Sequence, residues 1–384
     1  MTPRTVLISG AGVAGPTLAY WLARRGFRPT VVERAQGLRS SGSPVDVRGP
    51  AVAVADAMGI MPRLRAAATS ATTLTFLGAG SLPMQRAGSG AVELPRGDLA
   101  SILWQAARDD AEFLFDDTIT TLTQDGSGVD VTFDRAAPRR FDLVVGADGL
   151  HSLTRLLAFG PESDFIRHRG VYVATVALGR PLERADAVLM YNTPGRAVAL
   201  HPSRTEALAA FLFRSPVIDG FDHCDTAQHK RLLIAAFDGA GWIVPELLDR
   251  VRAADDLYFD AVSQVRMSGW SRGRVTLLGD AASSLSLFGE GSSLAMSGAA
   301  TLARALARHT SDVDTALRTY EAEHRKLVGS KQRYAGFAAA LLVPRTRAGL
   351  TARDLGVRLA SRLRREKAPC PSYPGASAGV GAAR

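Results

Sequence analysis

The order of apolar and polar positions divides the chain into segments with different periods. Near the N-terminus, the apolar run of residues 6–8 precedes residues 17–25, where apolar positions recur at helical spacing. This pattern predicts a buried strand, a turn and a helix. Further apolar runs end at Glu33, Gly146 and Gly279, and each predicts another buried strand that leads into a turn.

The middle of the chain follows a different pattern, with alternating or β-branched and aromatic positions. Runs at residues 170–176, 187–191 and 208–213 are separated by turn residues, which predicts a mostly antiparallel sheet. A similar run at residues 72–77 precedes a helix that we expect near residues 98–110.

Together these patterns predict an α/β protein in which a mostly antiparallel sheet domain is inserted into a nucleotide-binding domain of Rossmann type. The predicted division is residues 1–70, 96–164 and 271–335 for the first domain, 71–95 and 165–270 for the sheet domain, 336–366 for a basic helical segment, and 367–384 for a tail rich in Pro, Gly, Ala and Ser that we expect to be disordered.

The turn after the first predicted strand carries glycines at the spacing that binds a nucleotide pyrophosphate. Gly10 permits a tight turn, Gly12 lets the backbone approach the phosphates, and Gly15 allows close helix packing. Glu33 lies 23 residues after Gly10, where such units place the acid that accepts hydrogen bonds from the adenosine ribose. The loop therefore predicts a bound dinucleotide, although it does not distinguish FAD from NAD.

Two later turns each place an aspartate at the carboxyl end of a predicted strand, which is where α/β sheets bind ligands. These are Asp148, within residues 141–149, and Asp280, within residues 274–280. With these three motifs in this order, residues 4–335 resemble the FAD-dependent aromatic hydroxylases, the single-component flavoprotein monooxygenases typified by para-hydroxybenzoate hydroxylase and including the tetracycline-degrading monooxygenases. Three ordered motifs are more specific than any one of them.

The resemblance implies a Rossmann-like FAD-binding domain with an inserted antiparallel substrate-binding sheet, and it implies roles for several residues. Glu33 corresponds to the ribose ligand, Arg96 to an arginine between the flavin and adenosine ends, and Asp280 to the ribityl ligand. Asp148, with Arg155 close behind it, corresponds to a residue that supports FAD and the transient nicotinamide. The implied cofactor-binding set is Gly10, Gly12, Val13, Ala14, Gly15, Glu33, Arg34, Arg48, Arg96, Asp148, Gly279, Asp280, Gly291, Ser292 and Ser293.

Several positions have two interpretations. Arg48 falls where related enzymes hold an arginine near the flavin or pyrophosphate, and a solvated loop arginine is the alternative. Residues 292–308 predict a helix that directs its N-terminus at the flavin, where it could stabilise negative charge, or that packs in the core, and the two can hold together. Glu290 either orients a polar substrate group or is an exposed loop acid, and near the cofactor its charge would disfavour reduced flavin unless it points to solvent or meets an arginine. Candidate pocket residues, each with core packing as the alternative, are Met190, His201, Phe211, Phe213 and Phe288.

The chemistry implied by the resemblance uses FAD, NADPH or NADH, and O₂ to hydroxylate an aromatic or polycyclic molecule through a C4a-hydroperoxyflavin. We assign no catalytic side chain and no metal, because the cofactor supplies the reactive bonds. The alternatives are a flavin oxidoreductase of the same fold without hydroxylation and a non-catalytic, FAD-bound redox-sensing protein. Halogenation is disfavoured because residues 241–245, Gly-Trp-Ile-Val-Pro, lack the second tryptophan of the halogenase motif.

Composition favours a cytoplasmic protein. Cys224 and Cys370 cannot build a disulfide framework and have no metal-ligand spacing, which fits a reducing compartment. We expect no leader segment, and no apolar run reaches the roughly 18 residues that a transmembrane helix needs. The sequence leaves open whether the protein is a monomer or a homodimer.

The charge is unevenly distributed along the chain. The net charge is +9, but residues 345–384 contain nine basic and two acidic residues, so the rest of the chain is nearly neutral. This distribution does not predict nucleic-acid binding. We expect an amphipathic basic helix that packs on the enzyme with a solvated face, and weak attraction to an acidic surface, carrier protein or anionic substrate is the alternative.

Overall fold

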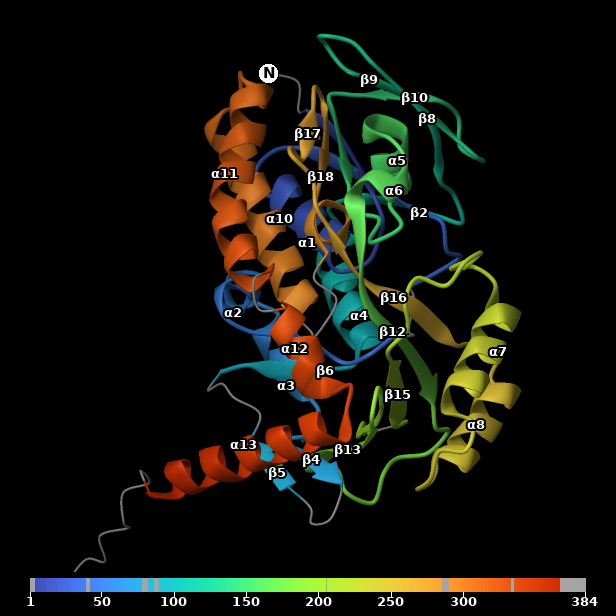
Figure 1. Ribbon diagram of the computed structural model, residues 1–384. Helices are drawn as coiled ribbons and strands as arrows, with labels where there is room; N and C mark the ends of the chain where they lie inside the picture. Colours follow the sequence, from blue (N-terminus) through green and yellow to red (C-terminus); the bar gives the residue numbers. More distant parts are fainter. Residues whose placement is uncertain are drawn as a thin grey trace, which may run out of the picture.

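The computed structural model describes residues 4–38, 42–77, 82–85, 90–204, 206–284, 290–332 and 335–366. Two main sheets organise this part of the chain, and long helices cover them (Figure 1). The first sheet carries the nucleotide-type motifs. The second sheet comes largely from the inserted middle of the sequence.

The first sheet has six strands in the order β17-β18-β11-β1-β2-β7. Its strands are β1 (Thr5–Ser9), β2 (Arg28–Glu33), β7 (Glu112–Phe115), β11 (Leu143–Gly146), β17 (Ser271–Arg272) and β18 (Val275–Leu277). All its pairings are parallel except that of β17 with β18. The carboxyl ends of β1, β2, β11 and β18 therefore meet at one edge, as the strand-turn patterns predicted.

Both faces of this sheet are buried, which explains the nearly continuous apolar runs of its strands. Val6 and Ile8 of β1 belong to a core under the helices, whereas Leu7 faces a three-stranded sheet on the other side. That small sheet has the order β10-β9-β8 and consists of β8 (Ile119–Gln124), β9 (Val129–Phe133) and β10 (Arg139–Phe141).

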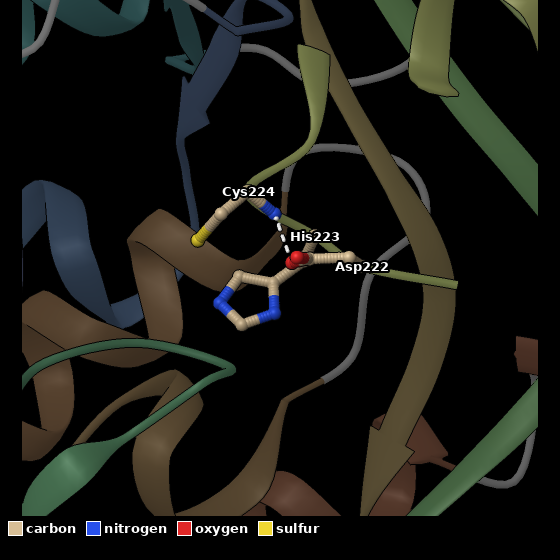
Figure 2. Close-up of side chains that lie close together, drawn as sticks. All are labelled: Asp222, His223 and Cys224. Carbon is tan, nitrogen blue, oxygen red and sulfur yellow. Dashed lines mark hydrogen bonds between the residues drawn. The ribbon is translucent and has the colours of Figure 1, made fainter. Parts of the chain in front are cut away.

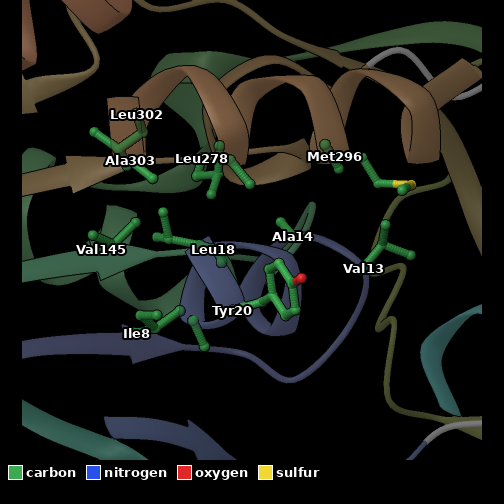
Figure 3. Packing of buried hydrophobic residues seen from close by; sticks show 14 of the residues in the cluster. Ile8, Val13, Ala14, Leu18, Tyr20, Val145, Leu278, Met296, Leu302 and Ala303 are labelled. Atoms are coloured by element: carbon green, nitrogen blue, oxygen red, sulfur yellow. The ribbon is translucent and has the colours of Figure 1, made fainter. Parts of the chain in front are cut away.

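Four helices cover the other face of the first sheet. They are α1 (Ala14–Ala23), α4 (Arg96–Ala107), α10 (Glu290–Arg308) and α11 (Val313–Gln332). Figure 3 shows how Leu18 of α1, Ile8, Val145 and Leu302 of α10 form one apolar layer. This core fixes the start of α1 and the start of α10 against the same edge of the sheet. The helices expected near residues 98–110 and 292–308 are α4 and α10.

The second sheet has seven strands in the order β16-β12-β15-β14-β13-β4-β5. Its strands are β4 (Thr73–Leu77), β5 (Leu82–Gln85), β12 (Ile166–Ala177), β13 (Ala187–Thr193), β14 (Arg196–His201), β15 (Leu208–Phe213) and β16 (Tyr258–Val265). The pairings are antiparallel except that of β13 with β4. The prediction of a mostly antiparallel sheet is confirmed.

Helices α7 (Thr226–Phe237) and α8 (Val244–Ala253) cover one face of the second sheet (Figure 1). The opposite face packs in part against α12 (Ala335–Leu342) and α13 (Arg347–Glu366), which the basic C-terminal segment forms. The remaining elements are β3 (Val45–Val47), β6 (Val92–Leu94), α2 (Pro50–Ala57), α3 (Met61–Ala67), α5 (Leu153–Phe159), α6 (Glu162–Phe165) and α9 (Asp280–Ser283).

Within the described parts of the chain, none of the helices combines the length and apolar character that crossing a bilayer requires.

Candidate functional site

A cavity of about 2220 Å³ extends from the carboxyl edge of the first sheet to the second sheet, α12 and α13. It joins segments from the whole length of the chain, because the carboxyl ends of β1, β2, β11 and β18, the start of α10 and the second sheet all contribute to its walls. The predicted site residues that line it are Gly10, Gly12, Val13, Ala14, Glu33, Arg34, Arg48, Arg96, Asp148, Asp280, Gly291, Ser292, Met190 and His201. Gly15, Gly279 and Ser293 lie behind this lining.

Close contacts exclude a side chain at two glycines of the turn, whereas the glycine between them faces open space. A Cβ atom at Gly15 would lie 1.9 Å from the Gly10 carbonyl oxygen, and one at Gly10 would lie 2.6 Å from the Ala147 carbonyl oxygen. A Cβ atom at Gly12 would meet no protein atom within 4 Å. The turn therefore packs tightly against the sheet and α1, while Gly12 leaves space for a phosphate at the helix N-terminus.

Glu33 ends β2 beside this turn. Its carboxylate accepts hydrogen bonds from the backbone N–H groups of Ala11 (2.8 Å) and Ala35 (3.0 Å). These bonds fix the position of the carboxylate at the cavity wall. The position is the one that the sequence motif assigns to a ribose ligand, and the ribose contact itself remains a prediction.

Asp280 begins α9 directly after Gly279, whose φ of 63° is left-handed and favours glycine. Burial raises the pKa of Asp280, while the positive charge of Arg96 opposes this shift. Gly291 lies close to Asp280, because a Cβ atom there would stand 3.4 Å from the Asp280 Oδ1 atom. The ends of β18, α4 and α10 thus converge around one carboxylate.

The start of α10 is tied to the loop after β3. The Ser293 hydroxyl donates to the Asp46 carbonyl oxygen at 2.7 Å and accepts from the Arg48 backbone N–H at 3.0 Å. Ser293 therefore holds the loop rather than facing the cavity, and Gly291 and Ser292 supply the helix N-terminus that lines it.

Glu290 meets an arginine, which is one of the two arrangements in which its charge would not oppose a reduced flavin. Its carboxylate pairs with the Arg48 guanidinium at 2.9 Å and with the Lys331 ammonium at 2.9 Å, and 20% of its side chain is exposed. The acid is therefore directed at two cations and not into the cavity. Arg48 is correspondingly not a solvated loop arginine, because it lines the cavity and contacts Glu290.

Asp148 has extensive protein contacts. Its carboxylate accepts hydrogen bonds from the Ser9 and Ser152 hydroxyls, and from the Thr154 backbone N–H and hydroxyl. Arg155 is buried and donates to the carbonyl oxygens of Ala281 and Leu150. Both residues join the turn after β11, which we call the mid-chain turn, to neighbouring segments. Asp148 therefore has a structural role, and its predicted cofactor contact would be a second one.

A charged cluster beside the cavity was missed in the sequence. The His151 imidazole contacts Glu162 at 3.0 Å through Nδ1 and Asp260 at 3.2 Å through Nε2, and it stacks on His223 with ring centroids 3.9 Å apart. Burial disfavours the charged imidazole, but the bonds to Asp260 and Glu162 outweigh it and raise the pKa of His151 to about 9. The available signal was Asp260, an acidic residue within the strand Tyr258–Val265.

The pocket prediction is wrong for Phe211 and Phe213. Successive side chains of β15 point to opposite faces of the sheet, so Ala210 and Leu212 line the cavity while Phe211 and Phe213 pack under α7 and α8. The core alternative is what the structure shows for both phenylalanines. Phe288 lies outside the described residues, and for Met190 and His201 a substrate contact remains a prediction.

The exposed side chains of Asp222, His223 and Cys224 come within 4.8 Å of one another (Figure 2). The Cys224 backbone N–H donates to the Asp222 carboxylate at 2.8 Å, which makes this segment a local turn. The turn explains the proximity of these consecutive residues, and we assign no metal to it.

The geometry places the site in the dinucleotide-binding class of α/β proteins, with an adjoining chamber beneath a second sheet. Residues 4–331 match the family described as FAD binding domain. A protein named "Uncharacterized protein Rv1260" from Mycobacterium tuberculosis is 39% identical over 342 residues, which cover 86% of this chain and 92% of that protein. A "Flavin-dependent monooxygenase" from an unknown prokaryotic organism is 36% identical over 321 residues, or 81% of this chain and 83% of that protein.

Among solved structures, that of tetracycline destructase Tet(55) superposes with a TM-score of 0.81 and 32% identity, covering 97% of this chain and 99% of the other. The chain therefore belongs to the FAD binding domain family and, within it, to the flavin-dependent monooxygenases. This confirms the family resemblance of the three motifs. FAD is the cofactor of this family, and the open space at Gly12 and the placement of Glu33, Arg96 and Asp280 fit it.

The two glycines of the turn should behave differently when each is replaced by alanine. Gly15→Ala should lower the thermal stability of the FAD-free protein, since overpacking costs about 1–3 kcal/mol or more. Gly12→Ala should leave that stability nearly unchanged, because its Cβ atom meets only open space in the protein. It should weaken FAD binding, because that space is the one left for a phosphate. Thermal melts of the FAD-free proteins and FAD titrations measure both effects. Equal melting temperatures for the two variants would contradict this steric interpretation.

Asp280→Asn should weaken FAD retention about tenfold to a hundredfold, the range expected for losing a charged hydrogen-bond acceptor. FAD is removed from the protein and then titrated back at equilibrium to measure its affinity. Asp255→Asn, which changes an exposed acid in a loop, is the matched control and should bind FAD like the unmodified protein. Unchanged FAD affinity in a folded Asp280→Asn protein would reject the assigned role.

The His151 cluster predicts a pH dependence of stability. Because the folded pKa of about 9 exceeds the ordinary value of 6.5, its stabilisation is complete below about pH 6.5 and is lost as the pH rises to about 9. The loss is at most about 3 kcal/mol. Between pH 6.5 and 9.5, His151→Gln should therefore lose less stability than the unmodified protein in chemical denaturation. His309→Gln is the control and should follow the unmodified protein; parallel pH profiles for all three would contradict the prediction.

Proposed function

We propose that this flavin-dependent monooxygenase uses NADPH or NADH and O₂ to hydroxylate an aromatic or polycyclic small molecule. The observation that carries the proposal is the continuity of the cavity, which runs from the nucleotide-type turns to an apolar wall on the second sheet. Its volume of about 2220 Å³ exceeds the roughly 300–1,000 Å³ of ordinary ligand pockets, so a dinucleotide and a substrate fit together.

Each end of the cavity has a separate task in this proposal. The glycine turn, Glu33, Arg96 and Asp280 would hold FAD, which when bound supplies the transfer of one oxygen atom from O₂. The second sheet would hold an aromatic ring beside it with apolar side chains such as Val188, Met190 and Leu212, and would exclude water from the reacting atoms.

The start of α10 supplies favourable electrostatics for this chemistry. The N-terminus of a helix carries partial positive charge, and Gly291 and Ser292 present it to the cavity. The carboxylate of Glu290 does not cancel this effect, because it pairs with Arg48 and Lys331. The start of α10 would therefore stabilise negative charge that develops on the bound cofactor.

The similarity to tetracycline destructase Tet(55) supports a substrate with several fused rings. The two widely separated cysteines support a cytoplasmic location. We further propose that the protein acts as a monomer or homodimer and that the nicotinamide binds only transiently.

The reaction is tested by incubating the FAD-loaded protein with NADPH, ¹⁸O₂ and a panel of electron-rich aromatic and polycyclic compounds. We expect a compound that accelerates NADPH oxidation and gains one ¹⁸O atom, as measured by mass spectrometry. Reactions with NADH and without oxygen serve as controls. Product formation without the label would favour a flavin oxidoreductase, and FAD binding without turnover of any compound would favour a redox-sensing protein.

A further inference from the structure

The part of the cavity beneath the second sheet, α12 and α13 forms a chamber with mostly apolar walls. Side chains such as Leu74, Val173, Val188, Met190 and Leu212 line it from the sheet. We call this part of the cavity the sheet chamber. An apolar wall of this kind suits a ring system but gives no polar group to orient it.

Arg353 brings a positive charge to the wall of the sheet chamber. It lies on α13, lines the cavity and is only 8% exposed. Its guanidinium carbon stands 4.0 Å from the centroid of the Phe76 ring. Burial of a charged group is costly unless it is paired, so its partners indicate what the group is for.

The partners of Arg353 hold the guanidinium in place without using all of its donors. Nε and one terminal nitrogen donate to the Asp354 carboxylate at 2.9 and 2.8 Å, and the other terminal nitrogen donates to the Asn192 side-chain oxygen at 2.7 Å. A guanidinium has five N–H groups, and these contacts among the described residues use three of them. Within the described part of the chain, one N–H group on each terminal nitrogen has no protein partner.

The surrounding charges also favour an anion. Arg358, which follows Arg353 on α13, also lines the cavity. Of the described lining residues on the second sheet, α12 and α13, Asp260 alone carries a carboxylate, and that carboxylate bonds to His151. The sheet chamber therefore offers a fixed cation whose acidic partner, Asp354, uses two of its five N–H groups.

We propose that Arg353 is a specificity-determining residue that binds an anionic oxygen, such as a carboxylate, phenolate or enolate, on an otherwise apolar ring substrate. This inference rests on the proposed function, because it assigns the sheet chamber to the substrate. A planar guanidinium held by Asp354 and Asn192 would orient such a group through the N–H groups that remain on its terminal nitrogens. The orientation of the ring beside the cofactor then follows from Arg353.

The test compares 1-hydroxy-2-naphthoate with 1-naphthol, which share the rings and the hydroxyl but differ in the carboxylate. Binding to the FAD-loaded protein is measured by quenching of flavin fluorescence. The unmodified protein should prefer the naphthoate, and Arg353→Gln should weaken naphthoate binding about tenfold to a hundredfold while changing naphthol binding little. Arg347→Gln, at the exposed start of α13, makes the same charge change and should bind both probes like the unmodified protein.

Two further variants separate recognition from folding. Arg353→Lys keeps the charge without the planar fork and should bind the naphthoate with intermediate affinity. Asp354→Asn removes the competing acid, so it should bind the naphthoate at least as tightly as the unmodified protein, whereas a merely structural ion pair would make it weaker for both probes. FAD content and melting temperature establish that each variant is folded.

Equal loss of both probes in Arg353→Gln, or a preference of the unmodified protein for 1-naphthol, would overturn the inference. Failure of either probe to bind the unmodified protein would also count against it. The proposed function fails separately, through absence of FAD binding or of ¹⁸O incorporation with either NADPH or NADH. A protein that hydroxylates neutral rings without regard to Arg353 would retain the function and lose only this specificity.

Discussion

The close approach of the glycine turn to the end of β11 is the constraint on which the site depends. Gly10 stands against the Ala147 carbonyl and Gly15 against the Gly10 carbonyl, at distances that exclude any larger residue. This contact fixes the start of α1 relative to the mid-chain turn that carries Asp148. Because β18 is parallel to β11 and next to it, Asp280 reaches the same edge of the sheet. Residues more than a hundred positions apart are thereby held around one cavity.

The second sheet needs its own attachment to this edge, and the charged cluster supplies one. His151 follows the turn after β11, Asp260 belongs to the second sheet, and Glu162 lies in α6, directly before β12 of that sheet. Interactions among partly buried charges are stronger than at the surface, since water screens them less. Together with the cores under α7, α8 and the C-terminal helices, the cluster holds the second sheet in place relative to the carboxyl edge of the first sheet.

The negative charge of Glu290 is neutralised at the start of α10, where this acid occupies the first turn of the helix. An acidic side chain pointing into the cavity would oppose the negative charge that flavin chemistry develops. The Arg48 and Lys331 contacts of Glu290 remove this conflict and join the loop after β3 to the ends of α10 and α11. The ion pair with Glu290 therefore also positions Arg48 at the cavity wall.

The sequence by itself determined the nucleotide-binding half of this protein. Gly10, Gly12 and Gly15 have the spacing of a nucleotide-binding turn, Glu33 ends an apolar strand and Asp280 lies in the turn after another, so their positions could be inferred from neighbours in the chain. The family resemblance and the antiparallel character of the inserted sheet were likewise predictable. Only the tertiary structure decided which side chains face the cavity, since Phe211 and Phe213 lie on the face of the sheet that α7 and α8 cover. It also decided which distant segments supply partners for His151 and Arg353. The physical reason is that strand register, helix docking and ion pairs between remote residues depend on packing, which no local spacing in the chain specifies.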